Sequence, residues 1–410
     1  MPDSVRAGAR VLGLGIIGLG GATLSMLPKF ASNPRYRIAG AADIDPEILA
    51  RFSADNPQAR THTSAADLCA QTDVDVVYIA TPNRLHFEHA RAAIEGGKNV
   101  LIEKPMTIDM RSATAMVESA ERAGVLLGVN VKHSFEPRVL RLREYARTGR
   151  FGRLRLLNSW RYANWLYRPR TPEELTPEWG GGILWRQGPH QFDILRTIGG
   201  GMVRSVRGTV GVWDPARRVA GAHTAFLDFE EGTVANAVFS GYDHFDSREL
   251  ITGLGASRAK GYAKARHELR AAQEPGWEAA AAREERYGGE RSGQGDAPLP
   301  ARGEGSWIMG GPLIASFDHA DVCFSPQGLE IFDDQNRYEV DLTGPEDGRD
   351  GRLNSFYDAV VHASPLPADG RWGLATLELL LAVERSGQER AEVRLAHQTS
   401  TVDVTPHPAG

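Results

Sequence analysis

A lysine and a histidine that lie far apart in the sequence have the side chains that the oxidation of an alcohol needs. Such a reaction requires a hydride acceptor, a base for the hydroxyl proton and a positive charge near the forming carbonyl oxygen. Lys104 lies in Glu103-Lys104-Pro105, and His190 follows a glycine-rich segment. We predict that both are catalytic, with His190 as the proton acceptor and Lys104 as the cation that orients the hydroxyl. The exchanged roles are the alternative.

The residues around His190 predict its environment. Pro189 suits the first turn of a helix, so we expect a helix over 189–198 with His190 near its N-terminus. The positive potential at a helix start disfavours a protonated imidazole and keeps a ring nitrogen ready to accept a proton. Asp193, one turn further along, would act in the opposite direction. We expect a neutral His190 that meets Lys104 across a crevice between two domains.

A glycine-rich turn follows the first apolar run of the chain. Gly18-Leu19-Gly20-Gly21-Ala22-Thr23 precedes a helix-like segment, 24–30. The first two glycines permit a tight bend next to a pyrophosphate, and the unpaired N–H groups of a helix start attract the anion. Thr23 stands where this motif usually has its third glycine. The alternative register, Gly13-x-Gly15-x-x-Gly18, lies inside the predicted strand and is rejected on position.

An acid follows the glycine turn at a suitable distance. Asp43 ends the second apolar run, 25 residues after Gly18, near the spacing of about 20 at which an acid meets the adenosine ribose. Its charge would repel a 2′-phosphate, and Ile44 cannot bind one, so the sequence favours NAD over NADP. Asp45 is the competing acid for the ribose. NADP remains the alternative cofactor because of Arg51.

Two further turns lie at the ends of predicted strands, where open α/β sheets bind ligands. One is Ala80-Thr81-Pro82-Asn83 with His86, and the other holds Lys104. For His86, a histidine that merely starts a helix is the competing interpretation. The predicted cofactor-binding residues are Gly18, Leu19, Gly20, Gly21, Ala22, Asp43, Thr81, Pro82, Asn83, His86, Glu103 and Lys104.

Arginines of the second half of the chain favour an anionic substrate, because a guanidinium group forms two parallel hydrogen bonds with a carboxylate. Arg168 and Arg170 could instead coat the surface of a proline-rich loop. The predicted substrate-binding residues are His133, Arg161, Arg168, Arg170, Arg186 and Gln187. No histidine spacing typical of a metal site occurs on a predicted helix, so we predict no metal.

The elements that must position these residues change in character near residue 130. Before it, five apolar runs alternate with helical segments, which is typical of a parallel sheet with crossover helices. The runs are 11–18, 37–42, 74–80, 99–103 and 125–129, and the helices are 46–55, 85–96 and 110–123. After it come longer strands, including a hairpin, and four helices. The strands are 154–163, 203–213, 224–230 and 233–240, and the helices are 136–148, 189–198, 353–362 and 373–386.

We therefore predict an α/β protein of two domains. Residues 1–130 form an NAD-binding Rossmann domain, and 131–410 form a substrate and oligomerisation domain with an open, mostly antiparallel sheet. A charged segment, about 255–305, interrupts the second domain. It is interpreted as a solvated insertion with a helix around Trp277–Tyr287, or alternatively as a lid or a subunit contact.

Composition excludes several classes of protein. The chain has 52 acidic and 47 basic side chains among 410 residues, so it lacks the positive field that nucleic acids attract. Cys69 and Cys323 are its two cysteines, which excludes a disulfide framework and a cysteine zinc site and fits a reducing compartment. No apolar run reaches the ~20 residues of a membrane span, and the first residues do not read as a signal peptide. We expect a soluble, cytoplasmic protein.

These motifs, in this order, resemble the Gfo/Idh/MocA oxidoreductase family. The resemblance rests on the glycine turn, Ala80-Thr81-Pro82-Asn83, Glu103-Lys104-Pro105 and the triple glycine 180–182 before His190. It implies a nicotinamide cofactor beside a lysine and a histidine, oxidation or reduction of a carbinol, and a homodimer or homotetramer. Many sugar and inositol members carry an aspartate four residues before the histidine, where this chain has Arg186.

Other segments resemble the phthalate dihydrodiol dehydrogenase branch of that family. They are His133-Ser134-Phe135, 165–170, 172–175, Trp213-Asp214-Pro215 and 241–247. This resemblance implies oxidation of a cis-dihydrodiol of an aromatic carboxylate to a catechol, with reduction of NAD. A sugar, inositol or glycoside dehydrogenase of the same family is the alternative. A dinucleotide-sensing protein without catalysis is the second alternative, and a sensor would need neither Lys104 nor His190.

Overall fold

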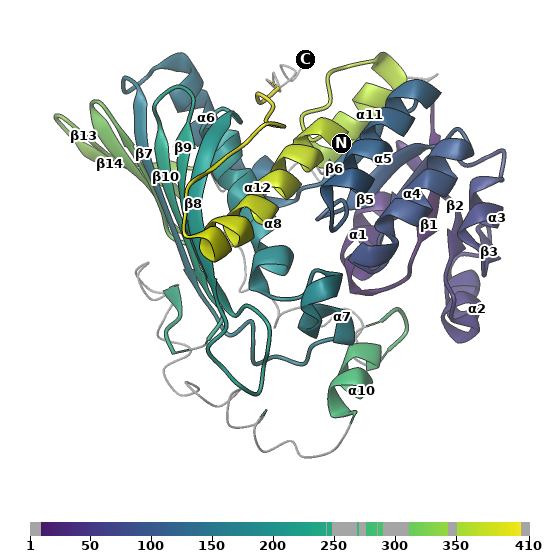
Figure 1. Ribbon diagram of the computed structural model, residues 1–410. Helices are drawn as coiled ribbons and strands as arrows, with labels where there is room; N and C mark the ends of the chain where they lie inside the picture. The colour runs from purple at the N-terminus through teal and green to yellow at the C-terminus, as the bar shows by residue number, and fades with distance from the viewer. Residues whose placement is uncertain are drawn as a thin grey trace.

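Two sheets with helices between them form the protein in the computed structural model (Figure 1). The structure describes residues 10–242, 244–247, 269, 276–284, 286–289, 311–342 and 351–402. Helices α8 (Ile183–Ile198) and α12 (Gly370–Glu389) lie in the centre of the molecule. They separate the sheet of the first third of the chain from the larger sheet of the remainder.

The first sheet has six strands in the order β3-β2-β1-β4-β5-β6, and all its neighbouring strands are parallel. Its strands are β1 (Leu12–Ile17), β2 (Tyr36–Ala42), β3 (Arg60–His62), β4 (Val76–Ile79), β5 (Asn99–Glu103) and β6 (Leu127–Asn130). Its helices are α1 (Gly21–Ser32), α2 (Pro46–Asp55), α3 (Ala65–Cys69), α4 (His86–Glu95) and α5 (Met110–Ala123). The predicted parallel sheet is confirmed. Strand β3 was not predicted, because three residues that include an exposed arginine form no apolar run.

The second sheet has nine strands in the order β14-β13-β12-β11-β7-β10-β9-β8-β15. Among its described pairs, β7 and β10 are parallel and the others are antiparallel, which confirms the predicted sheet and the β9–β10 hairpin. The strands are β7 (Leu154–Tyr162), β8 (Val203–Gly211), β9 (Ala222–Phe229), β10 (Val234–Ser240), β11 (Leu313–Phe317), β12 (Ala320–Phe324), β13 (Gly328–Asp333), β14 (Arg337–Asp341) and β15 (Val393–Arg394).

One face of the second sheet is covered by α6 (Pro137–Thr148), α8 and α12. Its strands alternate buried and more exposed residues, as in β10, because only one face meets the helices. The remaining short elements are α7 (Pro172–Leu175), α10 (Trp277–Glu284) and the 3₁₀ turns η1 (Asn83–Leu85), η2 (His133–Phe135) and η3 (Pro177–Trp179). Helix α10 lies where the sequence predicts one, and most of the charged insertion, 255–305, lies outside the described residues.

Helix α8 begins at Ile183, not at Pro189, so the predicted start of this helix is wrong. Gly182, with a φ of +92°, precedes the helix. Ile183, Leu184 and Trp185 are then buried, and their packing draws the first turn ahead of the proline. Pro189 lies inside the helix, where it removes one backbone N–H donor. His190 is therefore about two turns from the helix start, beyond the reach of the positive N-terminal potential.

The C-terminal part of the chain returns to the first sheet. Helix α11 (Gly351–His362) buries Leu353, Phe356 and Tyr357 in one apolar cluster with residues of β1 and β2. The Tyr36 hydroxyl donates to the Leu353 carbonyl at 2.6 Å. This packing places residues on both sides of the predicted boundary in one core, and the division at residue 130 stays a prediction.

Candidate active site

The glycine turn has the shape that a pyrophosphate requires. Gly18 has a φ of +91°, and a Cβ there would lie 2.9 Å from the Ala80 carbonyl oxygen. The buried Thr23 hydroxyl donates to the Gly18 carbonyl at 2.6 Å, so the residue in the third glycine position closes the turn. Helix α1 has no side-chain cap at Gly20 and no acid in its first turn, which leaves its N-terminal face suited to an anion. These residues fit a dinucleotide.

Asp43 lies half-buried at the end of β2, next to this turn. Its carboxylate accepts hydrogen bonds from the Leu19 N–H at 2.7 Å and the Asp45 N–H at 3.0 Å. Asp45, the competing acid, is the N-cap of α2 and accepts from Glu47 N–H at 3.0 Å. Arg51 donates to the carbonyl of Gly288 at 2.6 Å, so its guanidinium is held by the charged insertion.

His86 joins two strand-end turns. Its ring is buried, with Nδ1 3.0 Å from the Pro105 carbonyl oxygen and Nε2 2.8 Å from the Thr81 carbonyl oxygen. Burial lowers its pKa to about 4, so the ring is neutral near pH 7 and donates to one of the two carbonyls. His86 therefore fixes the Lys104–Pro105 turn against Thr81.

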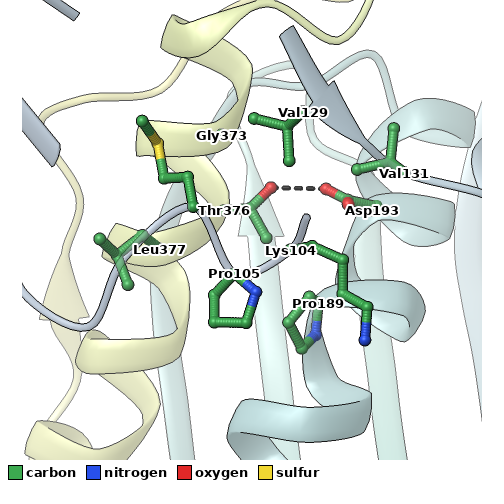
Figure 2. A pocket seen from close by; sticks show the side chains of 10 residues that line it. Lys104, Pro105, Val129, Val131, Pro189, Asp193, Gly373, Thr376 and Leu377 are labelled. Carbon is green, nitrogen blue, oxygen red and sulfur yellow. Dashed lines mark hydrogen bonds between the residues drawn. The ribbon is translucent and has the colours of Figure 1, made fainter. Parts of the chain in front are cut away.

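Lys104 reaches from the end of β5 to helix α8. Its Nζ donates to the backbone carbonyl of Arg186 at 3.1 Å. In Figure 2 its side chain runs beside Pro189, and Asp193 lies on the next turn of the helix. Burial lowers the pKa of Lys104 to about 8, and the neighbouring Glu103 carboxylate acts in the opposite direction. The small pocket at this point is lined by Lys104, Pro105, Met106, Val129, Val131, Pro189, Asp193, Gly373, Thr376 and Leu377.

His190 lies one turn after Arg186 and is 9% exposed. Burial holds its pKa well below the ordinary value, and the positive charges of Lys104, Lys132 and Arg352 lower it further. The ring is therefore neutral near pH 7, as predicted, but burial and nearby cations cause this rather than a helix N-terminus. Lys104, bonded to the Arg186 carbonyl, therefore lies within about one helical turn of His190, although 86 positions separate them in the sequence, and its charge acts on the His190 ring.

The predicted substrate arginines differ in what their guanidinium groups contact. Arg186 donates from Nη1 to the Asn83 side-chain oxygen at 3.4 Å, and its Nε is 3.7 Å from Glu174. Arg170 also pairs with Glu174, at 3.1 Å, and donates to the Trp165 carbonyl at 2.6 Å. Arg161 pairs with the buried Asp246 at 3.3 Å.

Arg170 and Arg186 share the carboxylate of Glu174, so this cluster carries a net positive charge. Arg168 lies near enough to lower the pKa of Arg170, which adds to that charge. The Asn83 side-chain nitrogen is buried with no hydrogen-bond partner among the described residues. An anion beside Arg186 would receive this N–H as well.

Both parts of the chain resemble known proteins. Residues 12–131 match an oxidoreductase family with an NAD-binding Rossmann fold, and residues 139–255 match the GFO/IDH/MocA C-terminal domain. The chain is 36% identical to 1-carboxy-3-chloro-3,4-dihydroxycyclohexa-1,5-diene dehydrogenase of Comamonas testosteroni, over 92% of this chain and 94% of that protein. It is 30% identical to 1,5-anhydro-D-fructose reductase of Ensifer adhaerens, over 52% of this chain and 63% of that protein.

A solved structure from Bordetella bronchiseptica RB50 superimposes with a TM-score of 0.83 and 35% identity, and the match covers 94% of this chain and all 100% of that one. The chain belongs to the Gfo/Idh/MocA oxidoreductase family. The predicted resemblance, the α/β fold and the assignment as an oxidoreductase with a dinucleotide-binding Rossmann domain are thereby confirmed.

The sequence did not predict the contacts that Glu103 makes. Glu103, predicted to bind the cofactor, accepts hydrogen bonds from the Tyr78 hydroxyl at 2.7 Å and from the side chain of Asn130. Asn130 in turn accepts from Arg352 at 2.7 Å. The carboxylate of the Glu-Lys-Pro motif thus ties β5 to helix α11, and no local pattern in the sequence announces an arginine 222 positions from its partner.

Among the described residues, no group of three or more histidine, cysteine, aspartate or glutamate side chains is placed to hold a metal ion. Within those same residues, no helix has both the length and the apolar character to cross a membrane.

Proposed function

We propose that this chain is an NAD-dependent dehydrogenase that oxidises a ring carbinol, namely a cis-dihydrodiol of an aromatic carboxylate, to a catechol. The observation that carries the proposal is the position of Arg186. Its backbone carbonyl accepts a hydrogen bond from the Lys104 ammonium at 3.1 Å, and its guanidinium belongs to a cluster with net positive charge. A ring carboxylate bound by Arg186 would hold a hydroxyl of the same ring near Lys104 and His190. The name of the Comamonas relative also denotes a carboxylated ring diol.

The roles of the two catalytic residues follow from their protonation. Lys104, whose pKa is about 8, is mostly protonated near pH 7 and orients the hydroxyl. His190, whose pKa lies well below its ordinary value, is neutral and accepts the hydroxyl proton. The bound nicotinamide supplies the hydride acceptor. Aromatisation of the product ring would then draw the reaction toward the catechol.

NAD is proposed over NADP because of Asp43 and Arg51. The Asp43 carboxylate lies beside the glycine turn, where its charge would repel a 2′-phosphate. Ile44, 88% exposed, offers no positive charge next to it. The guanidinium of Arg51 is already bonded to the Gly288 carbonyl at 2.6 Å.

The test is a substrate screen that follows absorbance of the reduced nicotinamide. We expect turnover of carboxylated cis-dihydrodiols with NAD and a lower KM than for their uncharged analogues. Arg186→Gln should raise KM for the carboxylated diol on the order of 10- to 100-fold and leave an uncharged diol nearly unaffected. Arg155→Gln, in an exposed pair with Asp318, is the matched control. Equal KM values for charged and uncharged diols would refute the anionic substrate.

A sugar, inositol or glycoside dehydrogenase is the second candidate. The similarity to 1,5-anhydro-D-fructose reductase over half of this chain favours it. Reversible turnover of polyols, with none of dihydrodiols, would decide for this candidate. No turnover of any alcohol despite dinucleotide binding would instead favour the sensing protein.

We further propose a homodimer or homotetramer formed through the uncovered face of the second sheet. Phe226 on β9 and Phe332 on β13 are 44% and 37% exposed on the side away from the helices. Apolar side chains on an uncovered sheet face commonly mark an interface. Light scattering of the purified protein measures the subunit number, and a monomer at micromolar concentration would refute the proposal.

A further inference from the structure

A second histidine lies against His190. His133 follows β6 in the turn η2, and its ring meets that of His190 edge to face, with centroids 4.8 Å apart and an interplanar angle of 83°. His133 is 7% exposed and His190 is 9% exposed. The two rings therefore form one buried pair, contributed by different parts of the chain.

Glu136 holds the ring of His133. Its carboxylate is hydrogen-bonded to the Nδ1 atom of His133. Glu136 is the N-cap residue of α6, but its side chain makes no capping hydrogen bond. An acid at a helix start usually serves the helix, so this carboxylate is diverted to the histidine. The bond places the His133 proton on Nδ1 and leaves Nε2 as an acceptor.

The charges around the two rings are unbalanced. Lys104 from β5, Lys132 from the turn before η2 and Arg352 from α11 act on His190 with positive charge. Asp193 lies one turn further along α8, but Thr376, Trp372 and Arg196 already surround one of its carboxylate oxygens. Glu136 is thus the carboxylate in direct contact with the pair.

We propose that Glu136, acting through His133, is a positioning residue that stabilises His190 after it has accepted the substrate proton. The inference rests on the proposed role of His190 as the base. In that step the hydroxyl O–H bond breaks and its proton goes to His190. The hydrogen of the same carbon leaves with its electron pair to the oxidised dinucleotide, and the carbonyl forms. The imidazolium then stands among three cations, and the Glu136 carboxylate offsets its charge before the proton leaves to solvent.

The position of Glu136 supports this role. Its side chain is 21% exposed, whereas that of His133 is 8% exposed. The carboxylate remains partly hydrated, so its negative charge carries a smaller desolvation cost than a fully buried one would. The negative charge of Glu136 thus lies on the solvent side of His133. It acts on His190 across the His133 ring.

The test compares Glu136→Gln with Glu136→Asp. Glutamine keeps the shape and removes the charge, whereas aspartate keeps the charge. With any alcohol that the wild type oxidises, Glu136→Gln should lower kcat on the order of 10-fold and raise the solvent deuterium isotope effect on kcat. Glu136→Asp should recover part of the loss. Glu144→Gln, on the same helix in an exposed pair with Arg141, is the matched control.

A second readout needs no turnover. In a histidine NMR titration of the protein without ligand, Glu136→Gln should move the midpoint of His190 to lower pH by about half a unit or more, because the imidazolium loses a nearby negative charge. Reduced dinucleotide should bind both proteins with equal Kd. An unchanged His190 midpoint would overturn the inference. A shifted midpoint with no oxidation of any alcohol would support the coupling but refute the proposed function.

Discussion

Two groups of buried ionisable side chains lie along helix α8, and they differ in how many of their hydrogen-bond donors have partners. The group around His190 includes His133, whose ring meets it edge to face, and Lys104, whose positive charge lowers the pKa of His190. The group one turn further along consists of Asp193 and Arg196. Both groups have displaced pKa values, because burial lowers that of His190 and raises that of Asp193 to about 6.

Most hydrogen bonds of the Asp193 group are made to α12, and the Arg196 Nη2 is buried with no hydrogen-bond partner among the described residues. Asp193 accepts hydrogen bonds from the Thr376 hydroxyl at 2.5 Å and from the Trp372 indole at 3.1 Å. Arg196, 0% exposed, donates to Thr376 at 2.7 Å and to the Trp372 carbonyl at 3.2 Å, and its guanidinium lies 3.8 Å from the centre of the Trp372 ring. This group fastens α8 to α12.

A displaced pKa therefore does not by itself distinguish a reactive group from a structural one. The distinction lies in the remaining hydrogen-bonding capacity: the Lys104 ammonium uses one of its three N–H donors, on a backbone carbonyl, whereas the Arg196 guanidinium uses three of its five. If this criterion holds, substitutions in the first group should lower turnover and substitutions in the second should lower the stability of the fold.

The largest effect is expected at the first group. Lys104→Ala and His190→Ala should each lower turnover on the order of 10² to 10⁴-fold, because each removes a group that acts on the reacting hydroxyl. Fluorescence titration should show dinucleotide binding largely intact. Unchanged turnover in both variants would remove the basis for the catalytic assignment.

A substitution in the second group should lower the free energy of unfolding rather than turnover. Arg196→Met leaves Asp193 buried without its guanidinium, and loss of one partner of a buried pair costs about 3–5 kcal/mol of the free energy of unfolding. Urea denaturation measures this loss. Arg204→Met, which breaks an exposed pair with Asp228, should cost less than about 1 kcal/mol. If Arg196→Met unfolds like the wild type, the second group is not structural.

The pH dependence separates the two assignments of Lys104. With Lys104 as the orienting cation, its protonated form is required, so kcat/KM should fall about tenfold per unit as pH rises above its pKa of about 8. With the exchanged roles, the neutral amine is required, and kcat/KM should rise toward pH 8 and then level off. A pH series of initial rates decides between them.

The smallest effect concerns Asp43, a carboxylate that is half-buried and partly satisfied. Asp43→Ala should reduce the preference for NAD over NADP, measured as a ratio of kcat/KM values, about tenfold. Asp43→Asn keeps an acceptor for the Leu19 N–H and removes only the charge, so it should shift the ratio nearly as far. An unmoved ratio in both would mean that another acid meets the ribose.

Local patterns were sufficient to predict five of the six strands of the first sheet, all but β3, and the turns at their ends. The glycine turn, Asp43 and the Glu103-Lys104-Pro105 segment are each contiguous, and parallel strands bring their ends to one edge. The fold class follows from the same alternation of apolar runs and helices. Lys104 and His190 could be paired because a resemblance to a known family joined two distant motifs.

Features that depend on how side chains pack in three dimensions were not predictable. The start of α8 was placed at Pro189 because proline favours a first turn, and the packing of Ile183–Trp185 outweighed that preference. Arg170 reads as a free cation in the sequence, yet it stacks on Trp165 and bonds to Glu174. Glu136 precedes a proline and reads as a plain helix cap, so its contact with His133 had no sequence signal.

The return of α11 to the first sheet has a consequence for synthesis of the chain. Leu353, Phe356 and Tyr357 complete an apolar cluster with strands that are made more than 300 residues earlier, as the 317 positions between Tyr36 and Leu353 show. A nascent chain that has emerged only as far as β14 still exposes the apolar surface that α11 will cover. The dinucleotide-binding sheet therefore reaches its full stability only after α11 has been made.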